Sequence, residues 1–205
     1  LGALTAVLLN PISAAALMQD SLGYESEGLM PMLQSSFLMV AAQHGVLMRS
    51  MSAIATLSQI DTLVFSQATL QQPGLATLIA GLRQHHEYTI YLFTSSQQPL
   101  THQGQIQIDS DHLFSVSSPA EERAQMQQWR SEGKRICYIG DGVSDLEVIE
   151  QAEIAISLNG LTDLADNPAA IILLDGSLQR FPYLLQLAQE FSIQQNRTLW
   201  INYVA

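Results

Sequence analysis

The sequence has 205 residues, is 47% hydrophobic and carries a formal net charge of −11. This length and apolar content predict a folded protein with one sizeable core, and disorder is not expected. Lys and Arg number only 8, which argues against a nucleic-acid-binding surface and against electrostatic attachment to anionic lipid. The single cysteine, Cys137, lies inside an apolar run, so an internal disulfide framework and a cysteine-rich metal site are excluded and a buried thiol is expected.

The N-terminal part of the chain contains two apolar segments. Residues 1–18 are interrupted by Asn10-Pro11, which leaves halves too short to span about 30 Å of hydrocarbon as one undisturbed helix. The pattern over 29–48 predicts a long amphipathic helix. Glu25 and Glu27 lie between the two segments, where they indicate either an ion path at membrane depth or an exposed loop between soluble helices.

The rest of the chain alternates predicted strands and helices. Short β-branched or aromatic runs predict strands, and Ser118 followed by Pro119 is typical of a helix start. This alternation predicts an α/β fold with a doubly wound parallel sheet and right-handed crossovers. The predicted strands lie near 62–66, 88–93, 136–139, 153–157 and 170–174, and the predicted helices span 73–84, 119–131, 143–151 and 180–205.

Two acids follow the strand predicted at 136–139, in the segment Gly140-Asp141-Gly142-Val143-Ser144-Asp145. A strand, a tight turn and a helix N-terminus would place Asp141 and Asp145 at the carboxyl edge of the sheet, where open α/β folds bind ligands. Hard oxygen ligands paired at such an edge suit Mg²⁺. An ordinary Asp-Gly turn with a capping acid produces the same pattern, so the motif alone leaves both interpretations open.

With these positions fixed, the chain resembles the P-type cation-transporting ATPases, particularly the heavy-metal branch, whose phosphorylation domain belongs to the haloacid dehalogenase superfamily. Residues 60–65 are similar to the strand that delivers the phosphorylated aspartate, Thr94-Ser95-Ser96 to the T-G-D loop, and 140–145 to G-D-G-x-N-D. Residues 45–50 are similar to the segment that leaves the fourth membrane helix, and 180–205 to the run into the fifth.

The resemblance implies a domain organisation. Residues 1–50 would be partial membrane or stalk helices, 51–178 a haloacid dehalogenase-like phosphorylation-domain core, and 179–205 a helix leading into a membrane segment. The sequence begins at Leu1 without a basic n-region or a cleavage pattern, so we expect no signal peptide and a fragment start.

The resemblance also implies which residues form the site. Thr94 would donate a hydrogen bond to the transferring phosphoryl oxygen, a positioning role. Asp141, with the backbone carbonyl of Ala68 and with Asp145 in support, would hold Mg²⁺. The phosphorylated aspartate of the family falls on Ser66, whose hydroxyl is a poor replacement for a carboxylate and removes one anionic Mg²⁺ ligand.

Further departures affect phosphate and nucleotide binding. The phosphate-neutralising lysine of the family falls on Glu122, and a carboxylate repels phosphate. Asp61 cannot replace the lost nucleophile, because it precedes Ser66 by five residues along a strand and therefore lies roughly 16 Å away at the opposite edge of the sheet. Only about seventy residues separate Ser66 from Gly140, and no His-Pro dipeptide occurs, so no nucleotide-binding domain is expected.

The metal-binding Cys-Pro-Cys of the family would fall on Leu22-Gly23-Tyr24, which offers no soft ligand for copper or zinc, although Glu25 and Glu27 would suit a harder cation.

Three functions remain open. The leading hypothesis is a truncated, degenerate P-type ATPase-like protein that is inactive alone, binds Mg²⁺ weakly and lies at a membrane, where other membrane-protein segments are its partners. The second is a partner module that binds a membrane protein or a metal ion without turnover. The third is a small Mg²⁺-dependent phosphatase of the haloacid dehalogenase type, which Asp141, Asp145 and Thr94 favour and Ser66 and Glu122 oppose.

Overall fold

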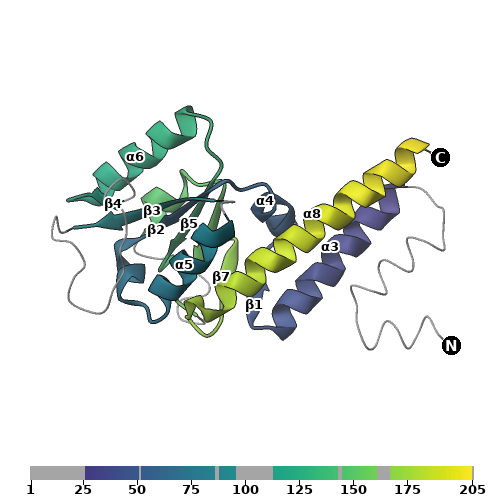
Figure 1. Ribbon diagram of the computed structural model, residues 1–205, viewed down its shortest axis with the longest axis horizontal. Coiled ribbons are helices and arrows are strands. Elements are labelled where there is room, and N and C mark those ends of the chain that lie inside the picture. The colour runs from purple at the N-terminus through teal and green to yellow at the C-terminus, as the bar shows by residue number, and fades with distance from the viewer. Residues whose placement is uncertain are drawn as a thin grey trace.

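The computed structural model describes residues 26–50, 52–85, 88–95, 113–142, 145–160 and 167–204. A twisted sheet with helices on both faces forms the main body, and two long helices, α3 (Ser26–Gln43) and α8 (Phe181–Val204), extend from it side by side (Figure 1). The apolar segment 1–18, residues 22–24 and Glu25 lie outside the described residues, so the predictions that concern them stay predictions.

The sheet has seven strands in the order β1-β7-β6-β5-β2-β3-β4. β1 pairs antiparallel with β7, and every other neighbouring pair is parallel. The predicted α/β fold and its five predicted strands, which are β2, β3, β5, β6 and β7, are confirmed. The strands are β1 Val46–Met48, β2 Thr62–Phe65, β3 Thr89–Thr94, β4 Leu113–Ser115, β5 Ile136–Gly140, β6 Ile154–Ser157 and β7 Ile171–Leu173.

The helix predicted over 29–48 is wrong at its C-terminal end. α3 ends at Gln43, and Gly45 adopts φ 72°, a left-handed conformation that terminates helices and that glycine tolerates without strain. The apolar residues that follow form β1 instead of a further helical turn. β1, whose residues were predicted as the end of a helix, and β4 are both additions to the predicted sheet.

The observed helices match those predicted from the sequence, except that some begin or end at other residues. The predicted helix 119–131 is confirmed as α6 (Pro119–Ser131), and Ser118 Oγ accepts a hydrogen bond of 3.3 Å from Glu121 N as its cap. The helix predicted over 143–151 is shorter, because α7 covers only Leu146–Ile149 of the described residues. The remaining helices are α4 Ala53–Leu57, η1 Gln67–Gln71, α5 Leu75–His85 and η3 Leu178–Arg180, which precedes α8.

The two faces of the sheet bury separate cores, because successive strand side chains point to opposite faces. Leu63 and Phe65 of β2 pack with α3, α4, α5 and α8, whereas Val64 packs with α6 and α7 on the other face. On the second face Trp129 of α6 stacks on Tyr91, with ring centroids 4.1 Å apart. Cys137 belongs to the first core and is fully buried, as its apolar context predicted.

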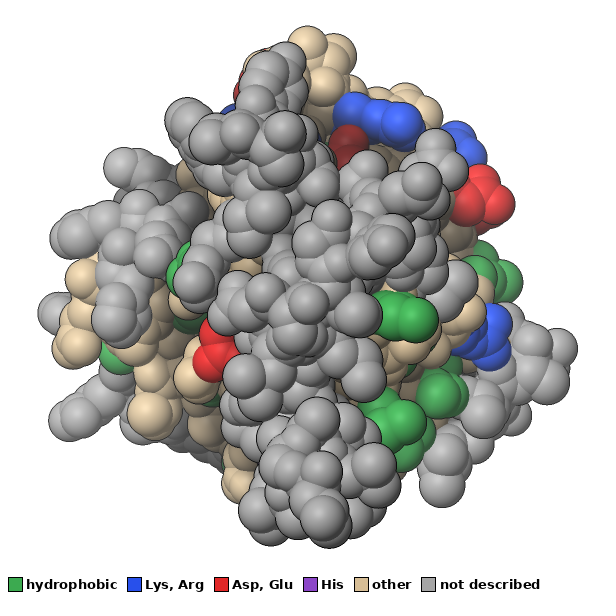
Figure 2. Space-filling model, turned by 90° about the vertical axis from the view of Figure 1, so that its right-hand side faces the viewer, with side chains coloured by type: hydrophobic (Ala, Val, Ile, Leu, Met, Phe, Trp, Pro, Cys, Tyr) green, Lys and Arg blue, Asp and Glu red, His purple; other side chains and the backbone are tan. Residues whose placement is uncertain are grey.

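α3 and α8 pack through an edge-to-face contact between Phe37 and Phe191, whose ring centroids are 5.3 Å apart. Met32, Met39 and Ile193 remain about 60% exposed on this pair. Figure 2 views this end of the molecule and shows apolar side chains at the surface together with acidic and basic ones. Of the described helices, none combines the length and apolar character needed to cross a membrane.

Candidate functional site

Three predicted site residues lie at one edge of the sheet. β2 runs parallel to both β3 and β5, so that Phe65 is in register with Leu92 and Ile139. Ser66 leaves β2 there, and its backbone N donates a hydrogen bond of 2.9 Å to Ile139 O. Thr94 ends β3 and Asp141 follows β5, so both lie at the same carboxyl edge as Ser66.

The chain turns sharply after β2. Ser66 O accepts hydrogen bonds from Thr69 N and from Thr69 Oγ1, at 3.1 and 2.6 Å. Gln67 Nε2 donates a hydrogen bond of 2.6 Å to Ser95 Oγ, which ties the exit of β2 to the exit of β3. Ala68 is exposed in η1 and Thr94 is buried, so the turn and the end of β3 form one side of the site.

The turn at Asp141 is held from the neighbouring strand. Ser157 Oγ donates a hydrogen bond of 2.8 Å to Asp141 O and accepts one of 2.7 Å from Asn167 Nδ2. Gly142 adopts φ 87°, and a Cβ there would lie only 2.5–2.7 Å from polar atoms of Asn167 and Ser157. The residue therefore has to be glycine for both conformational and steric reasons. Ser157 and Asn167 carry no recognisable motif, and sequence reasoning missed them.

Asp145 occupies the cap position of α7 and turns back toward β5. Its Oδ2 accepts a hydrogen bond of 3.3 Å from Asp141 N. A Cβ on Gly140 would collide with this carboxylate oxygen and would lie 2.7 Å from Tyr138 Cε1 and 3.2 Å from Ser66 Oγ. Asp145, Tyr138 and Ser66 therefore converge beside Gly140, where the absence of a side chain leaves room for them.

Tyr138 is a site component that sequence reasoning missed. Its side chain is fully buried, and its hydroxyl lies against both Asp145 and Ser66. Neither the Tyr138 hydroxyl nor Ser66 Oγ makes a hydrogen bond of good geometry, and both oxygens are buried. The available signal was its position two residues before Gly140, which places both residues on one face of β5.

The charges of the site are acidic. Burial, followed by the charge of Asp145, raises the pKa of Glu122 from 4.5 to about 7. Burial also raises the pKa of Asp145, and the charge of Asp141 adds to this, while the nearby Tyr138 hydroxyl and the Asp141 backbone N–H oppose it. The neighbouring Arg123 forms an exposed ion pair of 3.2 Å with Glu147. Glu122 thus interacts with another carboxylate, and the cation next to it in the sequence pairs elsewhere.

The donors at this edge are of the type that binds hard cations. Carboxylates, hydroxyls and carbonyls suit Mg²⁺ or Ca²⁺, and Mg²⁺ commonly uses one or two protein carboxylates together with water. Asp141, Asp145 and the carbonyl of Ala68 fit such a site in chemical type. Within the described ranges, no three His, Cys, Asp or Glu side chains are grouped closely enough to hold a metal ion, so the Mg²⁺ assignment stays a prediction.

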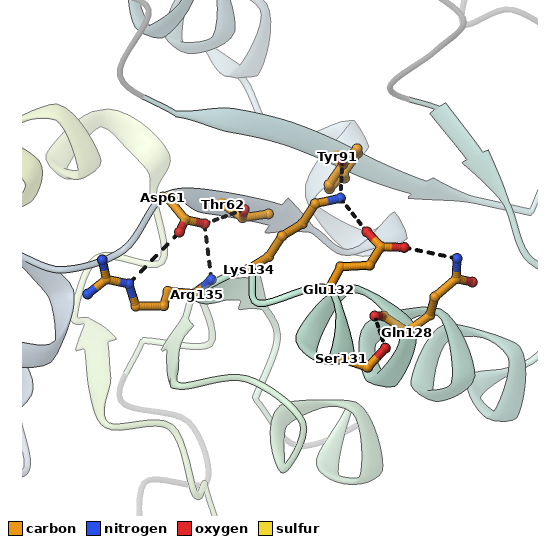
Figure 3. A network of polar contacts seen from close by, with 8 residues as sticks. All are labelled: Asp61, Thr62, Tyr91, Gln128, Ser131, Glu132, Lys134 and Arg135. Atoms are coloured by element: carbon orange, nitrogen blue, oxygen red, sulfur yellow. Dashed lines mark hydrogen bonds and ion pairs between the residues drawn. The ribbon is translucent and has the colours of Figure 1, made fainter.

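Asp61 lies at the opposite edge of the sheet, as predicted, because it precedes β2 whereas Ser66 follows it. Figure 3 shows the carboxylate in a polar network there. Its Oδ1 accepts hydrogen bonds from Thr62 Oγ1 and Arg135 N, at 2.6 and 3.0 Å. In the same network Lys134 Nζ donates a hydrogen bond of 2.8 Å to the Tyr91 hydroxyl. Asp61 therefore has a structural role and cannot replace the nucleophile.

A separate pocket of about 570 Å³ lies between α5 and the start of α8. Its lining includes Leu78, Leu82 and Leu185, with Gln186 and Gln189 among the polar residues. No predicted site residue lines it, so this pocket is distinct from the carboxyl-edge site.

Comparison with known proteins places the chain near the heavy-metal ATPases, although no family model matches. A probable copper-importing P-type ATPase A of Enterococcus hirae is 29% identical over 84 residues, which are 41% of this chain and 12% of the relative. A copper-exporting P-type ATPase of Staphylococcus aureus is 32% identical over 76 residues, or 37% of this chain and 10% of the relative. The chain thus spans about a tenth of the length of these curated relatives.

Solved structures show the same fold. The catalytic CPx-ATPase domain CopB-B superposes with a TM-score of 0.59 at 13% identity, covering 74% of this chain and 98% of that one. A zinc-transporting PIB-type ATPase superposes with a TM-score of 0.63 at 13% identity, covering 93% of this chain and 55% of that one. The sequence matches and the shared fold together show that this chain is a relative of the heavy-metal P-type ATPases and has the architecture of their catalytic domain.

Proposed function

We propose that this chain is a non-catalytic phosphorylation domain of the P-type ATPase kind, which keeps the fold and the acidic carboxyl edge but forms no phosphoenzyme. The observation that carries the proposal is the residue at the end of β2. Ser66 occupies the position that the resemblance gives to the phosphorylated aspartate, and its Oγ is buried without a satisfied hydrogen bond. A serine hydroxyl needs an engaged base to attack phosphate, and neither Asp145 nor Glu122 accepts a hydrogen bond from Ser66 Oγ.

The electrostatics of the site support the same proposal. Phosphoryl transfer depends on cationic groups that neutralise the phosphate oxygens. Here Glu122 stands where the resemblance places a lysine, and it faces Asp145. Once Glu122 is ionised, above about pH 7, it repels an approaching phosphate, and at about 4 Å and an effective dielectric near 20 a like-charge pair costs about 4 kcal/mol.

The internal length of the chain argues against ATP binding by this segment. About seventy residues connect Ser66 to Gly140, and the elements that the structure describes there are η1, α5, β3, β4, α6 and β5. These elements complete and cover the sheet. We therefore propose that this segment supplies no adenine pocket and that nucleic acid is not a partner either, given the net charge of −11.

Mg²⁺ is proposed to bind weakly through Asp141, with Asp145 and the carbonyl of Ala68 in support. When bound, the ion would neutralise negative charge at the carboxyl edge. Ser157 Oγ donates a hydrogen bond to the backbone carbonyl of Asp141, and this contact holds the turn that carries the acid in place. The family of copper and zinc transporters suggests that any cation transported by a larger assembly is a heavy metal, and this too is a proposal.

The helical pair offers a surface for a partner. Met32, Met39 and Ile193 are exposed on α3 and α8, and exposed apolar side chains favour contact with other apolar segments. We propose membrane-protein segments as the partners and the membrane as the location. This surface also favours the second candidate, a module that binds a membrane protein without turnover.

The test of the non-catalytic proposal is phosphorylation by γ-labelled ATP in the presence of Mg²⁺, quenched with acid. We expect no labelled protein and no release of phosphate. Acid-stable label that hydroxylamine removes would show an acyl phosphate and overturn the proposal. Phosphate release from small phosphomonoesters would instead identify the chain as a phosphatase.

A further inference from the structure

The pocket of about 570 Å³ between α5 and the start of α8 lies on the face of the sheet opposite to α6. Leu78 and Leu82 line it from α5, and Leu185 and Gln189 line it from α8. The two residues of each pair are four positions apart, so each helix presents one side to the pocket. α5 also packs against η3, which carries Leu178 into the lining.

The floor of this pocket is apolar, and its rim is polar without charge. Leu78, Leu82, Leu178 and Leu185 are each less than a tenth exposed and belong to the core beneath. The exposed lining residues are threonine, glutamine, glycine and proline. The chain has 19 acidic and 8 basic residues, yet none of the described lining residues is charged. The pocket is therefore built for an uncharged occupant.

Gly81 keeps the pocket open on the side of α5. Glycine in a helix interior is less favourable than alanine, so its presence there needs a reason. Gly81 lines the pocket, and a Cβ at this position would meet nothing within 4 Å. The missing side chain thus leaves space above the leucine floor that a larger residue would occupy.

The rim offers a hydrogen-bond acceptor that is held in place. Gln186 Nε2 donates a hydrogen bond of 3.0 Å to Glu190 Oε1, one turn further along α8. This bond uses the amide nitrogen and leaves the Gln186 carbonyl oxygen as an acceptor. Glu190 also brings negative charge close to the rim, which disfavours an anionic ligand.

We propose that this pocket binds a neutral small molecule with an apolar body and a hydrogen-bond donor, such as a hydroxyl or an N–H group. The body would cover the four leucines, and the donor would reach the Gln186 carbonyl. The volume lies within the range of about 300–1,000 Å³ that is usual for small-molecule sites. This site goes beyond the proposed function and uses no residue of the carboxyl edge.

The lining also excludes other ligand classes. Phosphates and nucleotides need cationic groups or several backbone N–H donors, and the described lining contains neither Lys nor Arg. Metal ions need carboxylate, imidazole or thiolate ligands, and the described lining contains none of these. An apolar body over a buried leucine floor is stabilised instead by the removal of both surfaces from water.

The test is a fluorescence titration of the whole chain with N-phenyl-1-naphthylamine, a neutral dye with an N–H donor whose emission rises in apolar surroundings. We expect saturable binding with a dissociation constant of about 10⁻⁵ M. The matched ligand is 1-anilinonaphthalene-8-sulfonate, which has the same ring skeleton and a negative charge, and it should bind at least about tenfold more weakly. The absence of saturable binding of the neutral dye, or equal affinity for both dyes, would overturn the proposal.

Thermal unfolding gives a second measurement. The neutral dye at ten times its dissociation constant should raise the melting temperature by about 3–6 °C, because it stabilises only the folded state. Binding without this shift would mean that the dye binds the unfolded chain as well, and the proposed pocket would be wrong.

Variants locate the dye. Gly81→Leu fills the pocket from α5 with a good helix former and should weaken binding of the neutral dye at least about tenfold. Ala80→Leu is the matched control, since Ala80 is exposed in the same helix and does not line the pocket. Circular dichroism and thermal unfolding establish that both variants are folded. Wild-type affinity in a folded Gly81→Leu variant would overturn the proposal.

Two further variants test the charge of the rim and the alternative surface. Gln179→Lys adds a cation to the rim and should strengthen binding of the anionic dye while leaving that of the neutral dye nearly unchanged. Ile193→Gln alters the exposed apolar surface of the helical pair and should not affect the neutral dye. If Ile193→Gln abolishes binding and Gly81→Leu does not, the dye binds the helical pair and the proposal is wrong. None of these outcomes depends on phosphoenzyme formation, so the proposed function is judged separately.

Discussion

Ser157 Oγ in β6 donates a hydrogen bond of 2.8 Å to the carbonyl oxygen of Asp141, one strand away. Asn167 completes this contact by donating to the same hydroxyl, and both side chains are fully buried. The acid that the sequence singles out is therefore positioned by residues on a neighbouring strand and on the segment before β7.

Replacing Ser157 with alanine should destabilise the chain by about 1–3 kcal/mol, because it leaves the Asp141 carbonyl and the Asn167 amide without this partner in a buried setting. Urea unfolding followed by circular dichroism measures the loss. Ser131→Ala is the control, since it removes an exposed side-chain hydrogen bond to Gln128 O and should cost much less. Equal losses of unfolding free energy in the two variants would show that the buried Ser157 contact contributes no more than an exposed hydrogen bond.

Gly140→Ala should destabilise the chain by about 1–3 kcal/mol or more, because the new methyl group would overlap the Asp145 carboxylate and the Tyr138 ring. Gly81→Ala is the matched control, and it should change the stability in the opposite direction. Gly81 lies inside α5, and a Cβ there meets nothing within 4 Å, so alanine should stabilise the helix by up to about 1 kcal/mol. Thermal unfolding of both variants measures the difference. A neutral Gly140→Ala would mean that the site is not packed as described.

Glu122 should make the chain less stable as the pH rises. Its pKa is raised from 4.5 to about 7, so the folded state holds the proton more tightly than the unfolded state. The resulting stability is fully present below about pH 4.5 and is lost as the pH rises to about 7. Because the side chain is partly exposed, we expect only about 1–2 kcal/mol over this window.

The measurement compares urea unfolding of the wild type and Glu122→Gln across this pH range. The glutamine variant should gain relative stability as the pH rises, since it has no proton to lose. Asp145, whose pKa is also raised, changes in the same direction in both proteins and cancels in the difference except where the two acids interact. Parallel stability curves would contradict the assignment of Glu122 to the buried acidic site.

Restoring the nucleophile alone should not restore chemistry. Ser66→Asp supplies a carboxylate at the end of β2, but Glu122 would still repel the phosphate. We expect no acid-stable label from ATP or acetyl phosphate in Ser66→Asp. The double variant Ser66→Asp with Glu122→Lys should accept label from acetyl phosphate, which needs no adenine pocket. Labelling of Ser66→Asp equal to that of the double variant would show that Glu122 has no effect on phosphate.

Mg²⁺ affinity should depend on the charge near Asp141. Wild type is expected to bind in the millimolar range, Asp141→Asn to lose binding, and Ser66→Asp to bind more tightly because it adds one anionic ligand. The gain could reach about two orders of magnitude, since one charge pair at about 4 Å is worth about 4 kcal/mol before desolvation is subtracted. Calorimetric titration measures all three. Equal affinity in all three proteins would mean that no such site exists.

The sequence by itself determined the order and direction of the main elements. Apolar runs after helical segments predicted β2, β3, β5, β6 and β7, and right-handed crossovers required these strands to be parallel. Parallel strands end at a common edge, so the residues that follow them, Ser66, Thr94 and Asp141, could be placed together from the chain alone. The same reasoning placed Asp61 at the opposite edge.

Only the tertiary structure decided what surrounds those residues. β1 and β4 are the two edge strands, and they form because a neighbouring strand offers free backbone groups. The contacts of Asp141 with Ser157, and of Tyr138 with Asp145 and Ser66, join residues whose positions along the chain are unrelated. A local sequence pattern predicts which face of an element is apolar. It does not predict which side chains of separate elements are in contact in the core, because those contacts depend on the register and spacing of the whole sheet.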